Sequence, residues 1–389
     1  MRILFCNYEY PPLGGGGGVV MAALARELAK RHEVTALTSR ASGLAAMADD
    51  AGVRIVRVPV LFRRQLDTAN FPSMLTYLPA AAWRSRSLKL ERGFDVVNTH
   101  FVVPTGPVGQ WIADWYRLPN VLSVHGGDLY DPSKKMSPHN HAWLRRPIRS
   151  LLRRADAVVA QSNNTRDNVR QIYGVERDVG LIPLGIDRPP RMDRVSPAAF
   201  GLPDGAFTIV TIGRLVARKQ TTQLVAAMAE SGVPHAHLLV VGGGPDEEPV
   251  RRAAAVHGIA DRVHLLGRLD DARKYRALAA ADLFASTSQH EGFGLVFLEA
   301  MAFGLPIVCY DHGGQTDYLA SGVTGFVLRL NDAQAFARSI RAIAELPDRG
   351  RSLGELNSRR VEEFFIDRCA ERYEAVFDRA VTEHRNRAA

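Results

Sequence analysis

Residues 283–303 read LFASTSQHEGFGLVFLEAMAF, and this stretch decides the fold. An apolar run of strand length, 283–287, leads into two glycines and then into a segment with helical spacing. A strand followed by a short loop and a helix is typical of a parallel sheet whose faces are covered by helices. Gly292 and Gly294 open the backbone where the helix begins, so amide groups at 294 and 295 can meet a phosphate oxygen.

Predicted strands and helices alternate in the same way along the whole chain, in two series. A joint rich in proline and glycine, at 183–190, separates them. The expected strands are 3–7, 34–39, 53–60, 95–101, 121–126 and 157–162, then 208–213, 237–242, 263–267, 283–287, 306–310 and 325–330. The sequence predicts an α/β protein with an N-terminal domain at 1–185 and a second domain at 186–365. The tail from about 355 to 384 has helical spacing, and we expect a C-terminal helix at 366–389 to pack back on the first domain.

Composition excludes several classes of protein. The chain has 389 residues, of which 46% are apolar and 23% charged, which is ordinary globular composition. No stretch reaches the roughly 18 consecutive apolar residues of a membrane-spanning helix, and the N-terminus lacks a secretory signal. Cys6, Cys309 and Cys369 are widely spaced among apolar neighbours, which indicates core packing in a reducing compartment. We expect a cytoplasmic protein, located at the inner face of the membrane if its basic surface meets lipid.

The net charge of +8 is unevenly distributed. Residues 1–185 carry 24 Lys plus Arg against 15 acidic residues, whereas residues 186–389 carry a net charge of −1. This asymmetry indicates an anionic partner for the first domain: nucleic acid, a phospholipid surface or a phosphorylated substrate. Basic residues gather around Trp143 at 134–154, and Arg63 and Arg64 follow an apolar pair. Such a region is either a solvated charged face or a peripheral contact with anionic membrane.

A glycine run follows the first strand. Gly14 to Gly18 lie between that strand and an amphipathic helix, where backbone amides can approach a phosphate; a flexible tight turn is the alternative. We expect Gly15, Gly16 and Gly17 to contact a ligand. The run does not match the dinucleotide fingerprint, because its third position is Val19 or Val20, and the chain has no P-loop motif.

Cationic and acidic side chains recur in the second half. Arg214, Arg218 and Lys219 come directly after a strand, where a parallel sheet binds ligands, and they suit a diphosphate; solvated surface charge is the alternative. Glu291 and Glu299 lie before and inside the helix that follows the glycines. The two carboxylates could bracket an extended ligand such as a nucleotide sugar, which carries hydroxyls at both ends of a diphosphate.

These motifs in this order resemble the retaining glycosyltransferases of family 4. The shared pattern is E-G-F-G-L-x-x-x-E at 291–299, G-R-L-x-x-x-K at 213–219, G-G-G-P at 242–245 and the glycine loop after the first strand. The resemblance implies the GT-B architecture, in which two Rossmann-like domains face an interdomain cleft. It also implies transfer of a sugar from a UDP or GDP sugar to a glycan or lipid-linked acceptor with retention, without metal or other cofactor. The absence of a D-x-D triplet agrees with metal-independent chemistry.

The resemblance also implies roles for particular residues. Arg214 and Lys219 would bind the donor diphosphate, with backbone at Gly294 and Leu295 on the phosphate nearer the sugar. Glu291 would hold sugar hydroxyls. The remaining expected contacts are Phe293 shaping the pocket, Glu299 on the ribose, Leu269 near the base, and His125 beside the transferred sugar. We expect His125, Glu291, Arg214 and Lys219 to serve catalysis. Gln220 and Asp317 depart from the family pattern, where glycine and glutamate are commoner.

Some alternatives stay open on sequence grounds. His125 ends a strand, where a lone histidine is often structural, and the same holds for His100. A nucleotide-sugar epimerase of the same fold is the alternative enzyme. A nucleic-acid-binding protein is the alternative outside enzymes, although the chain shows no nucleic-acid recognition motif and we expect no nucleic-acid partner.

Overall fold

The computed structural model describes residues 1–63, 71–132 and 136–388, which form two compact units. The first unit consists of Met1–Asp187 and Phe364–Ala389, and the second of Arg188–Glu363. Each unit is built around its own sheet.

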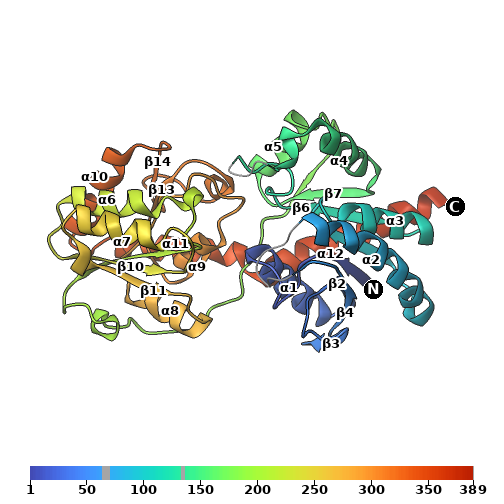
Figure 1. Cartoon of the computed structure of the whole chain (residues 1–389), viewed down its shortest axis with the longest axis horizontal. Coiled ribbons are helices and arrows are strands. Elements are labelled where there is room, and N and C mark those ends of the chain that lie inside the picture. The colour runs from blue at the N-terminus through green and yellow to red at the C-terminus, as the bar shows by residue number, and fades with distance from the viewer. Residues whose placement is uncertain (64–70, 133–135, 389) are drawn as a thin grey trace. The chain divides into compact units, whose positions relative to one another are not determined.

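The first unit contains an eight-stranded sheet with helices on both faces (Figure 1). Its strands lie in the order β3 (Met47–Asp50), β4 (Val53–Pro59), β2 (Glu33–Arg40), β1 (Arg2–Cys6), β5 (Val96–His100), β6 (Asn120–Val124), β7 (Ala157–Ala160) and β8 (Gly180–Leu181). Every pair is parallel except β3 with β4. The central strands are buried along their whole length, which explains their nearly continuous apolar sequences.

Two of the apolar clusters in this unit join parts of the sheet to its helices. Its helices are α1 (Gly16–Ala29), α2 (Phe71–Arg92), α3 (Gly106–Tyr116), α4 (Ala142–Arg154), α5 (Asn163–Gln171) and α12 (Ile366–Ala388), with a 3₁₀ turn at Pro138–Asn140. One core joins β2 and β4 to α2 and α3 through Leu37 and Tyr77. The other joins β6 and β7 to α4 and α5 through Leu122 and Ile148.

Helix α12 belongs to the first unit although it comes last in the chain. It contacts α1, β5 and β6, and Figure 1 shows it, in red, beside α1. The Tyr373 hydroxyl donates a hydrogen bond to Ser123 Oγ at 3.0 Å. Gly185 permits the crossing of the chain here, because a Cβ at this position would lie 2.8 Å from the Ile366 Cα.

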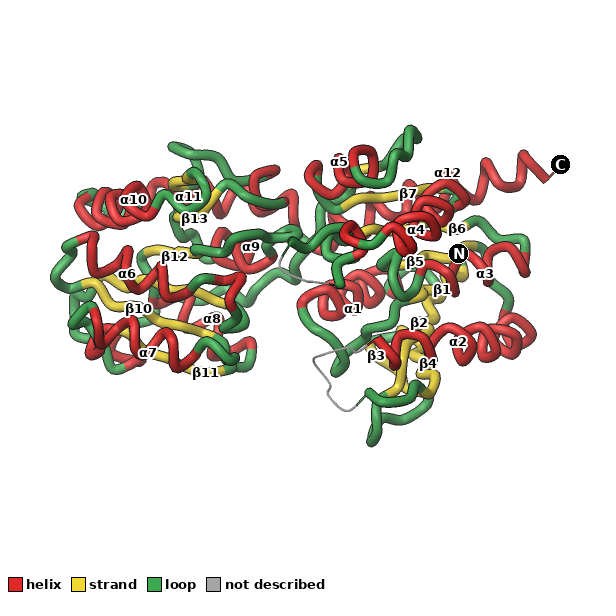
Figure 2. Tube along the Cα trace, turned by 45° about the horizontal axis from the view of Figure 1, so that its top comes forward, coloured by secondary structure: helices red, strands yellow, loops and turns green. Residues whose placement is uncertain are grey.

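The second unit contains a six-stranded, all-parallel sheet, seen in yellow between red helices in Figure 2. The order is β11 (Val263–Gly267), β10 (Ala236–Val241), β9 (Phe207–Ile212), β12 (Leu283–Ser286), β13 (Ile307–Tyr310) and β14 (Gly325–Leu328). The helices are α6 (Thr221–Ser231), α7 (Glu247–Val256), α8 (Asp271–Ala280), α9 (Leu295–Ala302), α10 (Ala333–Glu345) and α11 (Arg351–Arg360). The 3₁₀ turns are Pro197–Phe200, Ala217–Lys219, Ala260–Arg262, Gly314–Asp317 and Val361–Phe364.

The predicted α/β fold class and all twelve predicted strands are confirmed. Two strands were not predicted: β3, whose sequence MADD has no apolar alternation, and the two-residue β8. The tail predicted as one helical stretch is instead divided into α11 and α12 by the 3₁₀ turn Val361–Phe364. Within the described residues, no helix is both long and apolar enough to cross a bilayer.

Replacing Gly109 with alanine is expected to destabilise the first unit. A Cβ at Gly109 on α3 would lie 1.9 Å from Thr99 Oγ1, which already donates a hydrogen bond to Asn120 Oδ1 at 2.7 Å. Overpacking of this kind costs about 1–3 kcal/mol, against about 1 kcal/mol gained in helix propensity. Urea denaturation should therefore show a lower midpoint for Gly109→Ala. The control is Gly127→Ala, which places its Cβ in open space and should change little; an unchanged or higher midpoint for Gly109→Ala would contradict this packing.

Candidate active site

A buried carboxylate is paired with cations at the carboxyl edge of the second sheet. Lys219 lies in the 3₁₀ turn after β9, and its Nζ donates to Glu291 Oε1. Arg218 Nη1 lies 3.7 Å from Glu291 Oε2 and also donates to the His290 carbonyl. Glu291 is only 7% exposed. The structure thus brings Lys219 and Glu291, two predicted site residues, into direct contact.

The cations decide the protonation state of Glu291. Burial alone would raise the pKa of its carboxyl group, but the charges of Lys219 and Arg218 and hydrogen bonds from Lys219 and Ser288 outweigh burial. The pKa of Glu291 therefore lies below its ordinary value. At neutral pH Glu291 is an anion that can accept, but cannot donate, hydrogen bonds.

The backbone of Glu291 is fixed by the loop after β13. The Glu291 amide donates to the His312 carbonyl at 3.3 Å, and the Gly314 amide donates to the Glu291 carbonyl at 2.9 Å. Gly313 has φ +130°, and a Cβ there would lie 2.2 Å from the Glu291 carbonyl oxygen. Only glycine fits this position, so the loop holds the acidic side chain in place.

Arg214 follows β9 on the same edge as Lys219, and both line one small pocket with Ser286 of β12. Arg214 is exposed, and no hydrogen bond or ion pair links it to the residues that the structure describes. The turn that carries it packs on the G-G-G-P loop: a Cβ at Gly242 would lie 1.9 Å from the Gly213 carbonyl oxygen. The glycines of that loop thus permit close backbone contact with the Arg214 turn.

The start of α9 presents backbone amides near Glu291. Gly294 precedes the helix with φ +87°, and Leu295 is its first residue. The Tyr318 hydroxyl lies 2.8 Å from both the Phe293 and the Gly294 carbonyl oxygens and orients this turn. Phe293 is buried, with its ring 5.2 Å from that of Tyr318. The first amides of α9 have no carbonyl partner within the helix, so they can bind an anion.

Glu299 on α9 has a different environment from Glu291. Its Oε1 accepts a hydrogen bond from Lys274 Nζ on α8 at 2.8 Å, and Lys274 also lies 2.9 Å from Asp271 Oδ1. Burial raises the pKa of Glu299 above its ordinary value, against the effect of Lys274. Leu269, expected near the base, is half-buried in the segment that joins β11 to α8.

The predicted glycine contacts lie in the first unit, at the start of α1. Gly15 precedes the helix and has open space where a Cβ would be, and Gly16 is the first helical residue. Gly17 has a packing role, because its Cβ would lie 2.7 Å from the Phe101 ring. Gly14, with φ +96°, lies against Glu9.

His125 follows β6 and is part of a buried polar chain in the first unit. Its Nε2 lies 3.1 Å from His100 Nδ1, and its Nδ1 lies 3.2 Å from Gln161 Oε1. Its backbone amide donates to Asp128 Oδ1 at 2.9 Å. Burial lowers the pKa of His125 to about 4, despite the Gln161 hydrogen bond, so the imidazole is neutral at neutral pH.

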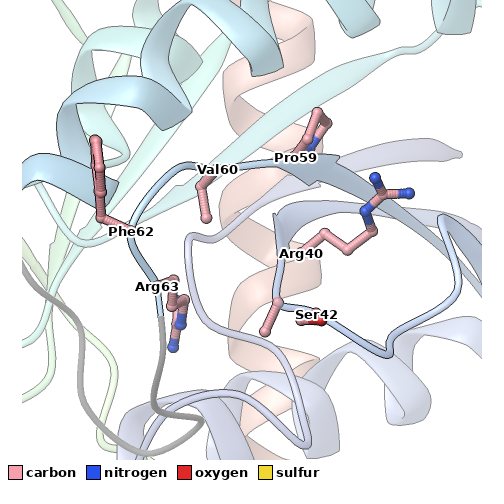
Figure 3. Close-up of a pocket in the computed structure, with 7 residues that line it drawn as sticks. Arg40, Ser42, Pro59, Val60, Phe62 and Arg63 are labelled. Carbon is pink, nitrogen blue, oxygen red and sulfur yellow. The ribbon is translucent and has the colours of Figure 1, made fainter.

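The basic region of the first unit centres on α4. Ile148, Leu151 and Leu152 of this helix are buried, whereas Trp143 is exposed, 56% accessible. Lys134 and Lys135, which were expected in the same region, lie outside the described residues, as does Arg64. A separate recess of about 410 Å³ is lined by Arg40 and Ser42 at the end of β2 and by Phe62 and Arg63 after β4 (Figure 3).

Sequence reasoning missed two side chains that organise this edge, Lys274 and Tyr318. Lys274 meets Glu299 from another helix, 25 residues away, and nothing in the local pattern of α8 distinguishes it from a solvated lysine. Tyr318 follows the turn Gly314–Asp317 and acts on backbone carbonyls, which no sequence motif reveals. Across the described ranges, no three His, Cys, Asp or Glu side chains come together as metal ligands.

Each of the two units matches a model of a known protein family. The family model "Glycosyltransferase Family 4" covers residues 14–188, and "Glycosyl transferases group 1" covers residues 193–360. A D-inositol 3-phosphate glycosyltransferase of Nocardia farcinica is 29% identical over 360 residues, or 87% of this chain and 79% of the relative. A GDP-mannose-dependent alpha-(1-6)-phosphatidylinositol monomannoside mannosyltransferase of Mycolicibacterium smegmatis is 28% identical over 90% of this chain and 91% of its own.

The architecture also agrees with solved structures. HepE of Anabaena in complex with UDP superimposes with a TM-score of 0.76 at 21% identity, covering 97% of this chain and 100% of the other. The two sheets, parallel except for β3 with β4, and this likeness show the GT-B fold. With both halves matched by the paired family models, the chain belongs to glycosyltransferase family 4. The sequence-based identification of the family is confirmed.

Replacing Lys219 with methionine is expected to destabilise the second unit by about 3 kcal/mol, because Glu291 is left as a buried anion with only Arg218 nearby. The destabilisation should shrink as pH falls, since Glu291 then takes up a proton and loses its charge. Chemical denaturation at several pH values measures both effects.

The control for this change is the double variant Lys219→Met/Glu291→Gln. It removes both charges and should recover a large part of the loss, giving a coupling energy well above 0.5 kcal/mol. If the double variant lost as much stability as Lys219→Met and Glu291→Gln lose together, the contact would contribute no coupling energy.

Proposed function

We propose that this glycosyltransferase moves a sugar from a UDP or GDP sugar to a glycan or lipid-linked acceptor, with retention of anomeric configuration and without a metal ion. The observation that carries the proposal is the cluster at the edge of the second sheet. Arg214, Lys219 and the first amides of α9 supply positive charge and hydrogen-bond donors there, beside the anionic Glu291. A diphosphate needs such donors, and sugar hydroxyls need such an acceptor.

The proposed donor contacts follow from these positions. Arg214 and Lys219 bind the diphosphate, and amides at Gly294 and Leu295 bind the phosphate nearer the sugar. Glu291 accepts hydrogen bonds from sugar hydroxyls, with buried Phe293 behind it. Glu299 accepts from the ribose, and backbone near Leu269 meets the base. From the first unit, we assign His125 and the glycines at 15–17 to the donor as well.

The proposed chemistry needs no nucleophile from the protein. The bond between the anomeric carbon and the diphosphate oxygen breaks as the acceptor oxygen attacks the same face of the sugar. The acceptor's proton passes to the departing diphosphate. The cations and helix amides stabilise the negative charge that develops on the diphosphate, a role that a metal ion fills in other enzymes.

The acceptor is proposed to carry an anionic group. The first half of the chain has a net charge of +9, and Arg40 and Arg63 line a recess in the first unit. The names of two relatives include a phosphate-bearing compound, D-inositol 3-phosphate in one and phosphatidylinositol monomannoside in the other. A basic acceptor domain suits such substrates by charge complementarity.

We also propose peripheral contact of residues 134–154 with anionic membrane. Helix α4 buries its apolar side in the core of the first unit, and its exposed side includes its arginines and Trp143. An indole and several guanidinium groups on one helix suit the headgroup region of a bilayer.

Replacing Arg214 with alanine is expected to lower turnover by about 100- to 1000-fold, because a donor aimed at the developing charge is lost. The fold should persist, since Arg214 is exposed and unpaired among the described residues. Turnover is measured as nucleotide released from UDP-glucose or GDP-mannose in the presence of acceptor and EDTA, and the anomeric coupling of the product reports its configuration.

The matched control for Arg214→Ala is Arg252→Ala, an exposed arginine on α7 that should leave turnover unchanged. Normal turnover in Arg214→Ala would contradict the donor assignment. Loss of all activity in EDTA, or an inverted product, would contradict the proposed chemistry.

Replacing Arg145, Arg149 and Arg153 with glutamine is expected to abolish binding to vesicles of phosphatidylglycerol at low salt, because attraction to anionic lipid is about 1 kcal/mol for each basic residue. Vesicle sedimentation measures this binding. The wild type should bind at low salt and dissociate at high salt. No binding of the wild type at low salt would contradict membrane contact.

A further inference from the structure

Lys274 lies near the proposed donor contacts of the second unit, and none of those contacts has been assigned to it. Its Nζ lies 2.8 Å from Glu299 Oε1 and 2.9 Å from Asp271 Oδ1, and 4.9 Å from the centre of the Tyr275 ring. The lysine side chain is 15% exposed, so the ammonium is largely withdrawn from solvent. The opposing charges hold its pKa above the ordinary value, although burial acts against them.

The hydrogen bond from Lys274 uses one carboxylate oxygen of Glu299 and leaves the other oxygen to accept from a ligand. Oε1 accepts from Lys274, and within the described residues no hydrogen bond or ion pair is made by Oε2. The Glu299 side chain is 18% exposed, so it is not fully enclosed. A single lysine therefore orients an acceptor group without blocking it.

We infer that Lys274 is a positioning residue for the donor: its charge and hydrogen bond fix the orientation of the Glu299 carboxylate, so that both ribose hydroxyls of the nucleotide can donate to it. This inference rests on the proposed function, because it concerns the group that meets Glu299. Lys274 itself acts through Glu299 and is not assigned a contact with the nucleotide.

The electrostatic environment explains why Glu299 depends on this lysine. Burial raises the pKa of Glu299, and the charge of Asp271 raises it further. Lys274 is the cation that opposes both effects. The elements packed around the pair contribute Asp271 and Tyr275 from α8 and Phe303 after α9, and these groups supply no second positive charge.

Loss of Lys274 would change what Glu299 can do. Without this cation, burial and the charge of Asp271 raise the pKa of Glu299 further, so the carboxyl group takes up a proton more readily. The protonated group is a donor at one oxygen, so it can no longer accept from two hydroxyls at once. The loss should affect the ribose hydroxyls and leave the rest of the nucleotide unaffected.

The test is isothermal titration of the full chain with UDP and GDP and with their 2′,3′-dideoxy analogues. Whichever ribonucleotide the wild type binds should bind Lys274→Met about ten- to a hundredfold more weakly at pH 7, the range for losing hydrogen bonds to a charged group. The dideoxy analogue should bind both proteins equally. Raising the pH from 7 to 9 should restore part of the affinity of Lys274→Met, because Glu299 then ionises.

Three further variants separate positioning from damage to the fold. Lys274→Arg keeps the charge and should retain affinity at pH 7. Glu299→Gln should lose ribonucleotide affinity to a similar extent, with no recovery at high pH, because it cannot ionise. Arg273→Met, an exposed neighbour on α8, should match the wild type.

The outcomes distinguish the inferred role of Lys274 from the proposed donor site. Equal weakening of the ribonucleotide and the dideoxy analogue in Lys274→Met, unchanged affinity for both, or a loss that does not recover at pH 9 would overturn the role of Lys274 while leaving the donor site intact. Failure of the wild type to bind either UDP or GDP would overturn the proposed donor site itself, and the role of Lys274 with it.

Discussion

Glu291 is a buried anion, and the edge of the second sheet is arranged around its neutralisation. Lys219 and Arg218 reach it from the turn after β9, 72 and 73 residues earlier in the chain. The turn that carries these cations is itself tied to the end of β12, since Thr287 Oγ1 donates to the Gln220 carbonyl at 2.8 Å. Because an unpaired charge at this depth is costly, the pairing couples the loops that follow two adjacent strands.

The close approach of these loops depends on glycine. Gly313 lies against the Glu291 carbonyl, and Gly242 against the Gly213 carbonyl, at distances that exclude a side chain. Backbone is therefore packed on backbone behind the charged cluster, and the cations project from a rigid base. Such a base suits the proposed diphosphate site, because preorganised donors need not rearrange when a ligand binds.

The fold could be predicted from the sequence because most strands are apolar runs and the segments between them have helical spacing. What failed was local: β3 has the sequence MADD, and its pairing with β4 comes from tertiary contact rather than propensity. At the candidate site, the sequence indicated which edge would carry charge, since Arg214, Lys219 and Glu291 all follow strands. It could not indicate that Lys219 would bond Glu291, or Lys274 Glu299, because those contacts join separate loops and helices.

The two carboxylates near α9 show how neighbouring groups of one type acquire different properties. Glu291 meets two cations and has a lowered pKa, whereas Glu299 meets one cation shared with Asp271 and has a raised pKa. Glu299 is thus protonated more easily than Glu291. In the first unit, burial keeps His125 neutral, so it offers a polar contact but no charge. In the proposed reaction, His125 therefore supplies no charge to the departing diphosphate, and the cations and helix amides of the second unit are assigned that role.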